Sequence, residues 1–375
     1  MSASLPATMT AAVLTGHGGL EMIEVRDNVT LPSLNAGDVL IRVGACGMNN
    51  TDVNTRTAWY SKGVSEGTTA EGGAGGFDKS EDQDATWGGR SLTFPRIQGA
   101  DVVGRIVAGG QGVDPNRVGE RVLVDPWLRD ASDPLDREKA GYFGSEHDGG
   151  YAQFTAVPAV NAISVTSDLS DLELATFPCS YSTAEYMLTK ARVGAGETVL
   201  VTGASGGVGS ALIQLSKRRG ARVIAVAGAS KLAAVEAVGA DHVIARDVPD
   251  LKAAVRDLAP GGLVDVAADI VGGGDFPSLI DLLVRGGRYV TSGAIAGPLV
   301  ELDLRTLYLR DLEVLGATVM PAEVFTNLVS YIERGEIRPL LAETFSLGQI
   351  REAQAAFLKK QHVGNFVIDL GSLGQ

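Results

Sequence analysis

The residues with the clearest chemical potential form a glycine-rich turn over residues 203–209, Gly-Ala-Ser-Gly-Gly-Val-Gly. Four β-prone residues, 199–202, lead into this turn, and a helical pattern of apolar residues follows it. Glycines at such a junction let the backbone approach a pyrophosphate closely, and the N–H groups and dipole at the helix start favour its negative charge. Because the turn joins a predicted strand to a predicted helix, we expect it to bind a dinucleotide; the alternative is a tight turn with no ligand.

The end of the second strand should decide which dinucleotide is bound. NAD-binding proteins usually place an acidic residue there to bind the ribose 2′-hydroxyl, but no Asp or Glu occurs from residue 198 to residue 235. The strand instead leads into Gly228, Ser230 and Lys231, and a hydroxyl and an ammonium group suit a 2′-phosphate. Lys231 could also be an exposed cation, although the first turn of a helix is an electrostatically poor place for one. The sequence therefore predicts NADPH (NADP) rather than NADH as the cofactor.

The elements around the turn alternate between strand and helix patterns. The predicted strands are residues 199–202, 222–226, 242–245, 264–270 and 288–292, and the predicted helices are 208–218, 231–238, 251–258 and 276–285. Such alternation with apolar strands predicts an α/β fold with a doubly wound parallel sheet and right-handed crossovers. Ligands of such sheets bind outside the carboxyl ends of the strands.

Composition restricts the class of protein and its partners. The chain has 375 residues and a net charge of −13, which argues against nucleic acid or an anionic membrane surface as a partner. No uncharged apolar run approaches the ~20 residues of a membrane helix, and the first nine residues do not resemble a signal peptide. Two cysteines, Cys46 and Cys179, are too few for a disulfide framework or a four-cysteine zinc site. We expect a cytoplasmic protein that acts on a small molecule.

A second motif, Gly-Ala-Cys-Gly-Met-Asn-Asn-Thr-Asp over residues 44–52, follows a β-rich opening. Together with the glycine turn it resembles the medium-chain dehydrogenase/reductase superfamily, and the resemblance extends to residue 370. The zinc alcohol dehydrogenases carry a Cys-His pair at the positions of Asn49 and Asn50. The quinone oxidoreductase branch carries Asn at the first position and Asp three residues later, as in Asn49 and Asp52 here.

The resemblance implies two domains. A β-rich GroES-like catalytic domain would comprise residues 1–160 and 320–375, and a Rossmann domain would comprise residues 161–319. Ala204 stands where the strict glycine pattern has its first glycine, and this variant is similar to that of the quinone oxidoreductases. The family commonly dimerises through an edge strand of the nucleotide-binding domain, so a homodimer is expected, with residues 294–302 as a candidate contact.

A catalytic zinc is not expected. It needs three protein ligands with N, S or O donors, and the matching positions here hold Asn49, Ala100 and Cys179, of which only the cysteine is a good ligand. The segment 125–150 occupies the place of the family's structural zinc lobe but has no cysteine. Its Glu-His-Asp run at residues 146–148 is unsuited to one ion, because three consecutive side chains cannot readily converge. Cys179 is expected to be a small buried residue beside the nicotinamide.

The resemblance also indicates site residues. Asn49 would donate a hydrogen bond where the zinc enzymes hold their metal, and Tyr60 would donate a hydrogen bond or a proton to the substrate. Each has a structural alternative: Asn49 as a turn residue bonded to backbone, Tyr60 as a side chain packed under the following loop. A lysine often found beside the closing strand's glycine is here Asn365. The expected cofactor-binding residues are Thr183, Ala204, Ser205, Gly206, Gly207, Val208, Gly209, Gly228, Ser230, Lys231, Val271 and Gly293.

Residues 61–95 are rich in Gly, Ser, Thr, Asp and Glu and show no helical or strand period. Loops of this length are usually functional lids or disordered segments. The stretch is therefore interpreted either as a flap that covers the substrate or as a solvated insertion without a role.

Taken with the resemblance, these features predict a zinc-independent, NADPH-dependent oxidoreductase that transfers hydride to a quinone or an α,β-unsaturated carbonyl compound. Two alternatives stay open at this point. One is a zinc-type alcohol dehydrogenase acting on alcohols or aldehydes, and the other is a non-catalytic NADPH-binding protein.

Overall fold

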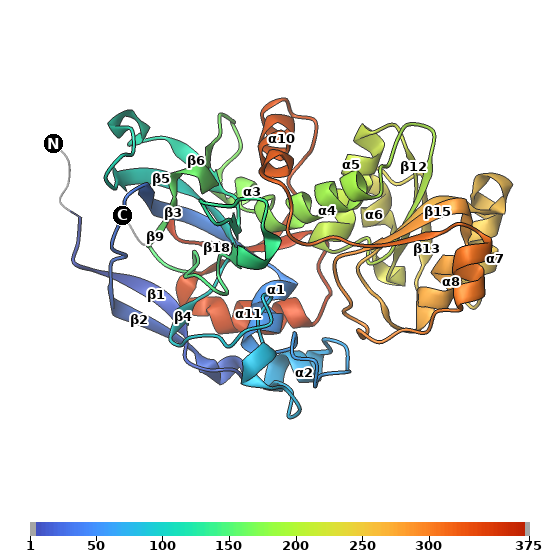
Figure 1. Cartoon of the computed structure of the whole chain (residues 1–375), viewed down its shortest axis with the longest axis horizontal. Coiled ribbons are helices and arrows are strands. Elements are labelled where there is room, and N and C mark those ends of the chain that lie inside the picture. The colour runs from blue at the N-terminus through green and yellow to red at the C-terminus, as the bar shows by residue number, and fades with distance from the viewer. Residues whose placement is uncertain (1–4, 372–375) are drawn as a thin grey trace.

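In the computed structural model, which describes residues 5–371, the second half of the chain forms a six-stranded sheet in which every neighbouring pair of strands is parallel (Figure 1). In spatial order its strands are β13 (His242–Ala245), β12 (Arg222–Ala227), β11 (Thr198–Val201), β14 (Val264–Asp269), β15 (Leu283–Thr291) and β16 (Glu313–Gly316). The order reverses between β11 and β14, which is the point where dinucleotides bind in sheets of this kind. The predicted doubly wound parallel sheet is confirmed.

Helices connect these strands: three agree with the predicted bounds to within one residue, one ends earlier than predicted, and the helix over residues 304–309 was not predicted. They are α5 (Gly207–Arg218), α6 (Leu232–Val238), α7 (Leu251–Leu258), α8 (Phe276–Asp281) and α9 (Leu304–Leu309). The prediction of a helix over residues 276–285 was wrong beyond Asp281, because the chain enters β15 at Leu283 and pairs there with Val264. Gly286 has a φ of 74°, a left-handed conformation that suits glycine and does not continue a helix.

The β-rich part of the chain is built around β3 (Asp38–Met48), which pairs with β5, β9 and β18. Within residues 5–371 it belongs to a seven-stranded sheet with the order β10-β6-β5-β3-β18-β17 and β9 beside β3, next to a three-stranded sheet β2-β1-β4. The remaining bounds are β1 (Thr8–Leu14), β2 (Ile23–Thr30), β4 (Arg96–Ile97), β5 (Asp101–Gly109), β6 (Arg121–Val124), β9 (Phe154–Pro158), β10 (Ala162–Ser164), β17 (Leu341–Ser346) and β18 (Asn365–Asp369). The last two strands return from the parallel sheet, so the end of the chain lies beside the motif at residues 44–52.

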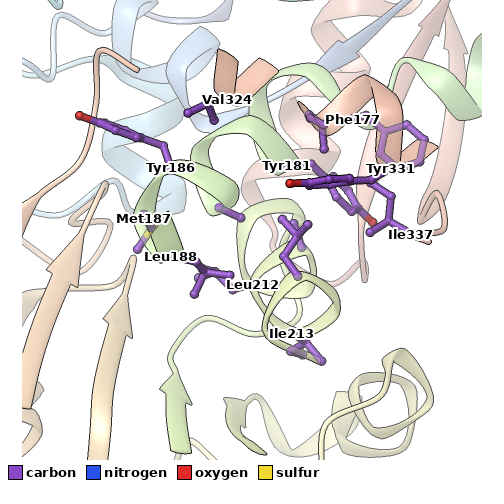
Figure 2. Packing of buried hydrophobic residues seen from close by; sticks show 14 of the residues in the cluster. Phe177, Tyr181, Tyr186, Met187, Leu188, Leu212, Ile213, Val324, Tyr331 and Ile337 are labelled. Carbon is purple, nitrogen blue, oxygen red and sulfur yellow. The ribbon is translucent and has the colours of Figure 1, made fainter. Parts of the chain in front are cut away.

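Two long helices join the two sheets. The helix α4 (Pro178–Lys190) packs against both α5 and α10 (Ala322–Glu333). Figure 2 shows the apolar side chains of this junction, in which Tyr181 and Leu188 from α4 meet Leu212 from α5 and Tyr331 from α10. Burial of side chains of this size stabilises the junction by about 1.5–3 kcal/mol each.

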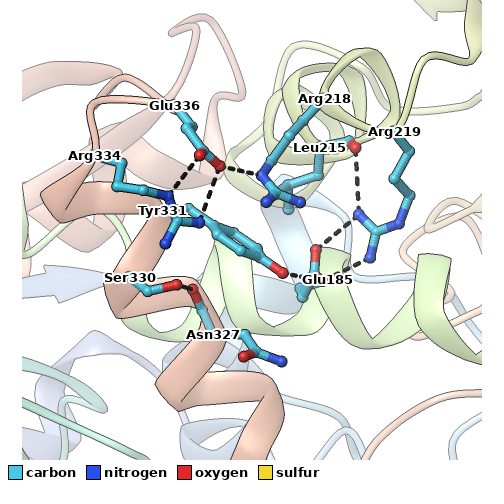
Figure 3. Close-up of polar contacts among 9 residues, drawn as sticks. All are labelled: Glu185, Leu215, Arg218, Arg219, Asn327, Ser330, Tyr331, Arg334 and Glu336. Carbon is cyan, nitrogen blue, oxygen red and sulfur yellow. Dashed lines mark hydrogen bonds and ion pairs between the residues drawn. The ribbon is translucent and has the colours of Figure 1, made fainter.

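A polar cluster lies beside this apolar junction (Figure 3). Glu185 on α4 binds Arg219 at 2.6 Å and accepts a hydrogen bond from the Tyr331 hydroxyl at 3.3 Å. The Arg218 guanidinium lies 3.5 Å from the centre of the Tyr331 ring. Buried ion pairs add little net stability, because desolvation offsets their attraction. Their role here is to fix how α4, α5 and α10 lie relative to one another.

Three shorter helices lie below β18 in Figure 1, namely α1 (Asn50–Arg56), α2 (Ala70–Gly75) and α11 (Ile350–Leu358), while α3 (Asp171–Leu174) precedes α4. The expectation of no regular structure over residues 61–95 was wrong at α2, where the Thr69 hydroxyl accepts a hydrogen bond from the Gly72 N–H and caps the helix. In the lobe at 125–150, β7 (Trp127–Leu128) pairs with β8 (Gly141–Tyr142). None of the helices in the described part of the chain is long and apolar enough to span a membrane.

Candidate active site

The glycine turn has the geometry of a dinucleotide-binding turn. Gly203 adopts a left-handed φ of 58°, and α5 begins four residues later at Gly207. A side chain at Gly209 would come within 2.7 Å of the Ala204 Cα, so this glycine allows the helix to pack closely on the turn. A Cβ at Gly206 would meet, among the described residues, only the Gly203 carbonyl oxygen at 3.6 Å. The space above Gly206 is therefore open to a ligand.

The edge where the adenosine end of a dinucleotide would lie is basic. Among the described residues, no atom lies within 4 Å of a Cβ built on Gly228, and Ser230 is exposed. The Lys231 Nζ lies 3.4 Å from the Ser205 Oγ and donates a hydrogen bond to the Lys360 carbonyl oxygen. Burial, followed by the neighbouring Arg246, lowers the pKa of Lys231. Lys231 is therefore not the freely solvated cation of the alternative interpretation, because it lies against the glycine turn.

The carboxyl ends of β14 and β15 are held together by Asp269, a fully buried residue that the sequence analysis did not single out. Its carboxylate accepts hydrogen bonds from the Thr202 and Tyr289 hydroxyls and from the Val271 N–H at 2.8 Å. These contacts fix Val271 in the loop after β14, and Gly293 lies next to it, where a Cβ would be 3.3 Å from the Ile270 carbonyl oxygen. Both residues thus lie at the ligand-binding edge of the sheet, together with the glycine turn.

Asn49 lies at the centre of a network of side chains from four elements. Its Nδ2 donates to Asp101 on β5, and its Oδ1 accepts a hydrogen bond of 3.0 Å from Ser180 on α4. Ser180 in turn accepts a hydrogen bond of 2.8 Å from the Asn365 Nδ2 on β18. The Asn49 side chain is therefore bonded to other side chains, and Asn49 also caps α1 through a capping box with Asp52, so the structure contains features of both interpretations. Asp52 braces the turn by accepting a hydrogen bond of 2.8 Å from the Asn49 N–H.

Two buried carboxyl groups lie beside Asn49, and each can hold a proton near neutral pH. Burial raises the pKa of Asp101 to about 7, although hydrogen bonds from the Cys179 N–H and from Asn49 lower it in part. Burial likewise raises the pKa of Asp52 to about 6, despite hydrogen bonds from the Asn49 N–H and the Tyr151 hydroxyl. Asp101 was not among the site residues predicted from the sequence. An acid among the apolar residues of β5 was the signal that could have marked it as a site residue.

Aromatic residues form one wall of the site. The Tyr60 hydroxyl and the Trp87 Nε1 both donate to the Thr51 Oγ1, at 3.2 and 3.0 Å. The Trp87 ring stacks on Tyr142, whose hydroxyl donates to the Cys179 Sγ at 3.2 Å. Burial raises the pKa of Tyr60 and of Tyr142 well above the usual range, so both hydroxyls stay protonated and can act as donors. Tyr142 was missed in the sequence, because it lies over 80 residues from Tyr60.

Thr183 lies one helical turn after Cys179 on α4, and its hydroxyl forms a hydrogen bond with that thiol. Burial, with Asp101 nearby, raises the pKa of Cys179 well above the usual value. Cys179 is therefore a neutral thiol, half-buried rather than enclosed. Thr183 and Tyr142 therefore contact the same thiol, so α4 contributes Thr183 to the wall that contains Tyr142.

The first part of the segment 61–95 reaches across to the parallel sheet. The Thr68 hydroxyl donates to the Asn54 side chain on α1 at 3.1 Å. A Cβ at Gly67 would lie 2.5 Å from the Ile295 carbonyl oxygen, so the backbone there touches the loop after β15. The same loop is bonded to Val271 through the Ala296 N–H at 2.8 Å. This placement favours the flap over the solvated insertion.

The residues present do not fit a catalytic zinc. Ala100 offers no donor atom and Asn49 is engaged by Asp101 and Ser180, so of the three matching positions only Cys179 offers a good zinc ligand. Within residues 5–371, no group of three or more His, Cys, Asp or Glu side chains is arranged to hold a metal ion. In the lobe, Glu146 accepts hydrogen bonds from the backbone N–H groups of Tyr142 and Gly88. Its carboxylate does not converge with the neighbouring side chains of residues 147 and 148 on one metal site.

Residues 35–167 match the family model "Alcohol dehydrogenase GroES-like domain", and residues 207–334 match "Zinc-binding dehydrogenase". The chain is 49% identical to a "putative alcohol dehydrogenase" from Sinorhizobium meliloti 1021, whose crystal structure superposes with a TM-score of 0.85 over 97% of both chains.

Two curated relatives are more distant. An acryloyl-coenzyme A reductase from Metallosphaera sedula is 29% identical, over 96% of this chain and 99% of its own length. A quinone oxidoreductase from Mus musculus is 26% identical, over 92% of each chain. The resemblance drawn from the glycine turn and the motif at residues 44–52 is confirmed by these matches.

Proposed function

Because the chain belongs to the medium-chain dehydrogenase/reductase superfamily, we propose that it is a zinc-independent, NADPH-dependent oxidoreductase that reduces a quinone or an α,β-unsaturated carbonyl compound. The observation that carries this proposal is the network around Asn49, which places neutral donors and a protonatable carboxyl group where the zinc enzymes hold a metal. Two relatives support the substrate class, since acryloyl-coenzyme A is itself an α,β-unsaturated carbonyl compound and quinones contain the same conjugated group.

The residues fit a nicotinamide dinucleotide. The open space above Gly206 lies at the start of α5, and the basic residue Lys231 lies beside Ser205 where a 2′-phosphate would be. When bound, the cofactor would supply a hydride to the electron-poor carbon of the substrate. The preference for NADPH rests on the absence of an acid between residues 198 and 235 and on Lys231.

Residues of the chain would stabilise the negative charge that hydride transfer creates on the substrate. Negative charge develops on the carbonyl oxygen, and donors placed there in advance lower the barrier. The donors proposed for this oxygen are the second Nδ2 hydrogen of Asn49 and the Tyr60 hydroxyl, whose single hydrogen would turn from Thr51 to the substrate. Asp101 keeps the Asn49 amide in one orientation and can hold a proton near pH 7. The flap residues near Gly67 would exclude water from the reaction.

A screen of NADPH oxidation over quinones, enones, enals and an acryloyl thioester tests the proposal. With the best substrate, Asn49→Ala should lower kcat/KM by about 10²-fold, the size seen when one such donor is lost. Tyr60→Phe should lower it about 10-fold or more, since proton transfer by a positioned side chain contributes roughly 10²–10⁴-fold. Asn327→Ala, on the exposed side of α10, is the matched control and should change nothing.

Unchanged kcat/KM in both site variants would refute the assignment of Asn49 and Tyr60. Alcohol oxidation that requires stoichiometric zinc, measured by metal analysis of the purified protein, would favour the alcohol dehydrogenase alternative. Tight NADPH binding with no turnover of any substrate would favour the non-catalytic alternative.

We further propose a homodimer formed through the outer edge of the parallel sheet. The strand β16 is the edge strand, and large apolar side chains are exposed beside it, namely Leu299, Leu304, Tyr308 and Val314. Exposed apolar residues gathered at a sheet edge usually mark an interaction site. Sedimentation equilibrium should give twice the chain mass, and the double substitution Tyr308→Asp, Val314→Lys should give the single mass. A monomeric unmodified protein would contradict the proposal.

A further inference from the structure

Lys360 adopts a backbone conformation that normally calls for glycine. The helix α11 ends at Leu358, and Lys360 follows with a φ of 52°, while its N–H bonds the Phe357 carbonyl oxygen at 3.1 Å. Glycine is the usual residue at such a left-handed helix end, because any Cβ is strained there. A strained residue that is not glycine is a reason to ask what its side chain does.

The Lys360 side chain is buried near a second lysine, Lys231, although an oxygen and an aromatic ring contact its amine. Its Nζ is 2.6 Å from the Asn50 Oδ1 and 3.7 Å from the centre of the Phe357 ring. Burial, with Lys231 nearby, lowers the pKa of Lys360 to about 7. Burial and the same two lysines lower the pKa of His362 to about 4.

Within residues 5–371, the charged groups that shift the pKa values of the cluster Lys231, Lys360 and His362 are all basic. Lys231 acts on Lys360, both lysines act on His362, and Arg246 acts on Lys231. The groups that contact the Lys360 amine from the packed elements, the Asn50 amide of α1 and the Phe357 ring of α11, are neutral. Asn365, where the family often has a lysine, is buried and bonded to Ser180, so it adds no charge. Lysines brought together without a counter-charge are stabilised when an anion binds between them.

The cluster lies against the glycine turn. The Gly364 N–H donates to the Ser205 carbonyl oxygen at 2.9 Å, and Gly364 forms a parallel bridge with Gly206. Lys231 contacts both the Ser205 hydroxyl and the Lys360 carbonyl oxygen. The segment 360–364 therefore runs along the turn at the start of α5, where N–H groups and the helix dipole already favour an anion.

We propose that Lys360 binds the pyrophosphate of the dinucleotide cofactor, while Lys231 serves the 2′-phosphate. The assignment rests on the proposed nicotinamide cofactor. It makes Lys360 a determinant of affinity for NADPH and NADH alike, because both contain the pyrophosphate. It makes Lys231 a determinant of the preference between them, because only NADPH carries the 2′-phosphate.

The test is the dissociation constant of each cofactor, measured by calorimetric titration of the full chain. Lys360→Gly should weaken NADPH and NADH by about 10-fold or more each, as expected for loss of a charged contact. Lys231→Met should weaken NADPH by about 10-fold and NADH less than twofold. Lys359→Met is the matched control, since it removes the same charge from the neighbouring exposed lysine and should leave both constants unchanged.

Glycine at position 360 suits the observed φ, so Lys360→Gly should keep the melting temperature at or above that of the unmodified chain. If its affinities for both cofactors equal those of the unmodified chain, the assignment of Lys360 is wrong, whichever cofactor is preferred. If the unmodified chain binds neither cofactor, the proposed function itself fails and this inference with it.

A second readout is the pH dependence of NADH binding, which avoids the titration of the 2′-phosphate. A bound pyrophosphate should raise the pKa of Lys360 from about 7, so binding takes up a proton above pH 7 and affinity falls as pH rises. We expect the affinity to fall roughly 10-fold from pH 6.5 to 8.5, with proton uptake visible as a dependence of the binding heat on the buffer. Lys360→Gly should remove both effects, and their persistence in that variant would overturn the proposal.

Discussion

Gly206→Asp is expected to abolish measurable binding of NADPH while the chain stays folded. Gly206 precedes α5 with a φ of −80° and a ψ of 174°, which is an ordinary conformation for the residue that caps a helix start. Aspartate is among the residues preferred at this position, and its charge complements the helix dipole. The same carboxylate would lie in the open space above the turn and would repel the pyrophosphate. We expect a loss of more than ~100-fold in affinity, or about 3 kcal/mol.

The measurement pairs a calorimetric titration with a thermal melt. Gly206→Ser is the matched control, because serine caps the helix equally well without a charge, and it should weaken NADPH far less. Gly207→Ala should behave differently, since its Cβ would lie 2.6 Å from the Asn365 Nδ2 and would disturb the packing of α5 against β18. A Gly206→Asp variant that binds NADPH within threefold of the unmodified chain would show that the turn does not hold the pyrophosphate.

Arg56→Met is expected to destabilise the β-rich part of the protein by roughly 3 kcal/mol, because a buried acceptor left without its partner costs about 1–3 kcal/mol. Arg56 is completely buried at the end of α1. Its guanidinium donates to the Gly18 carbonyl oxygen at 2.7 Å, to the Gln354 Oε1 at 2.9 Å and to the Gly73 carbonyl oxygen. Methionine would fill the volume and leave all three acceptors unpaired.

Arg56 also keeps its charge, although burial lowers its pKa to about 10 in spite of the nearby Glu21. The stability of Arg56→Lys should therefore lie between those of the unmodified chain and Arg56→Met, since the ammonium of a shorter side chain cannot bond three acceptors that lie in different directions. Arg26→Met is the matched control: Arg26 forms an exposed pair with Glu24, and such pairs contribute about 0–1 kcal/mol. Urea unfolding followed by circular dichroism gives the comparison. Equal stability of the Arg56→Met and Arg26→Met variants would show that the buried guanidinium does not hold these segments together.

The buried arginine also clarifies the resemblance. Arg56 and Tyr60 lie four residues apart, just after the motif at residues 44–52 that carries the resemblance. In the structure the two have separate surroundings: Arg56 bonds to α11 and to the α2 helix, whereas Tyr60 bonds to Thr51 in the aromatic wall. Two residues that are close in the sequence thus have different roles: Arg56 stabilises the fold, and Tyr60 belongs to the candidate site.

Local patterns in the sequence were enough to predict the parallel sheet and the glycine turn. In strands and helices alike, the apolar residues recur at the spacing that places them on the buried face. This spacing can be read from consecutive residues, so it predicts both kinds of element from the sequence. Helix α8 marks the limit of this reasoning, because the apolar residues 282–284 suit a helix as well as a strand, and pairing with β14 decided for the strand. Strand β17 was not foreseen, since its burial pattern shows no clear alternation.

The sequence by itself therefore determined the fold class and the glycine turn between a strand and a helix, because each depends on residue types at fixed local spacing. Only the tertiary structure brought Asp101 and Ser180 to Asn49, Tyr142 to Trp87, and Lys360 to the glycine turn. These partners lie at least 52 residues apart in the sequence, and each side chain is buried beside its partner only when the chain folds. The pKa of Asp101 is raised and that of Lys360 is lowered because folding removes both side chains from water. No local sequence pattern predicts that burial.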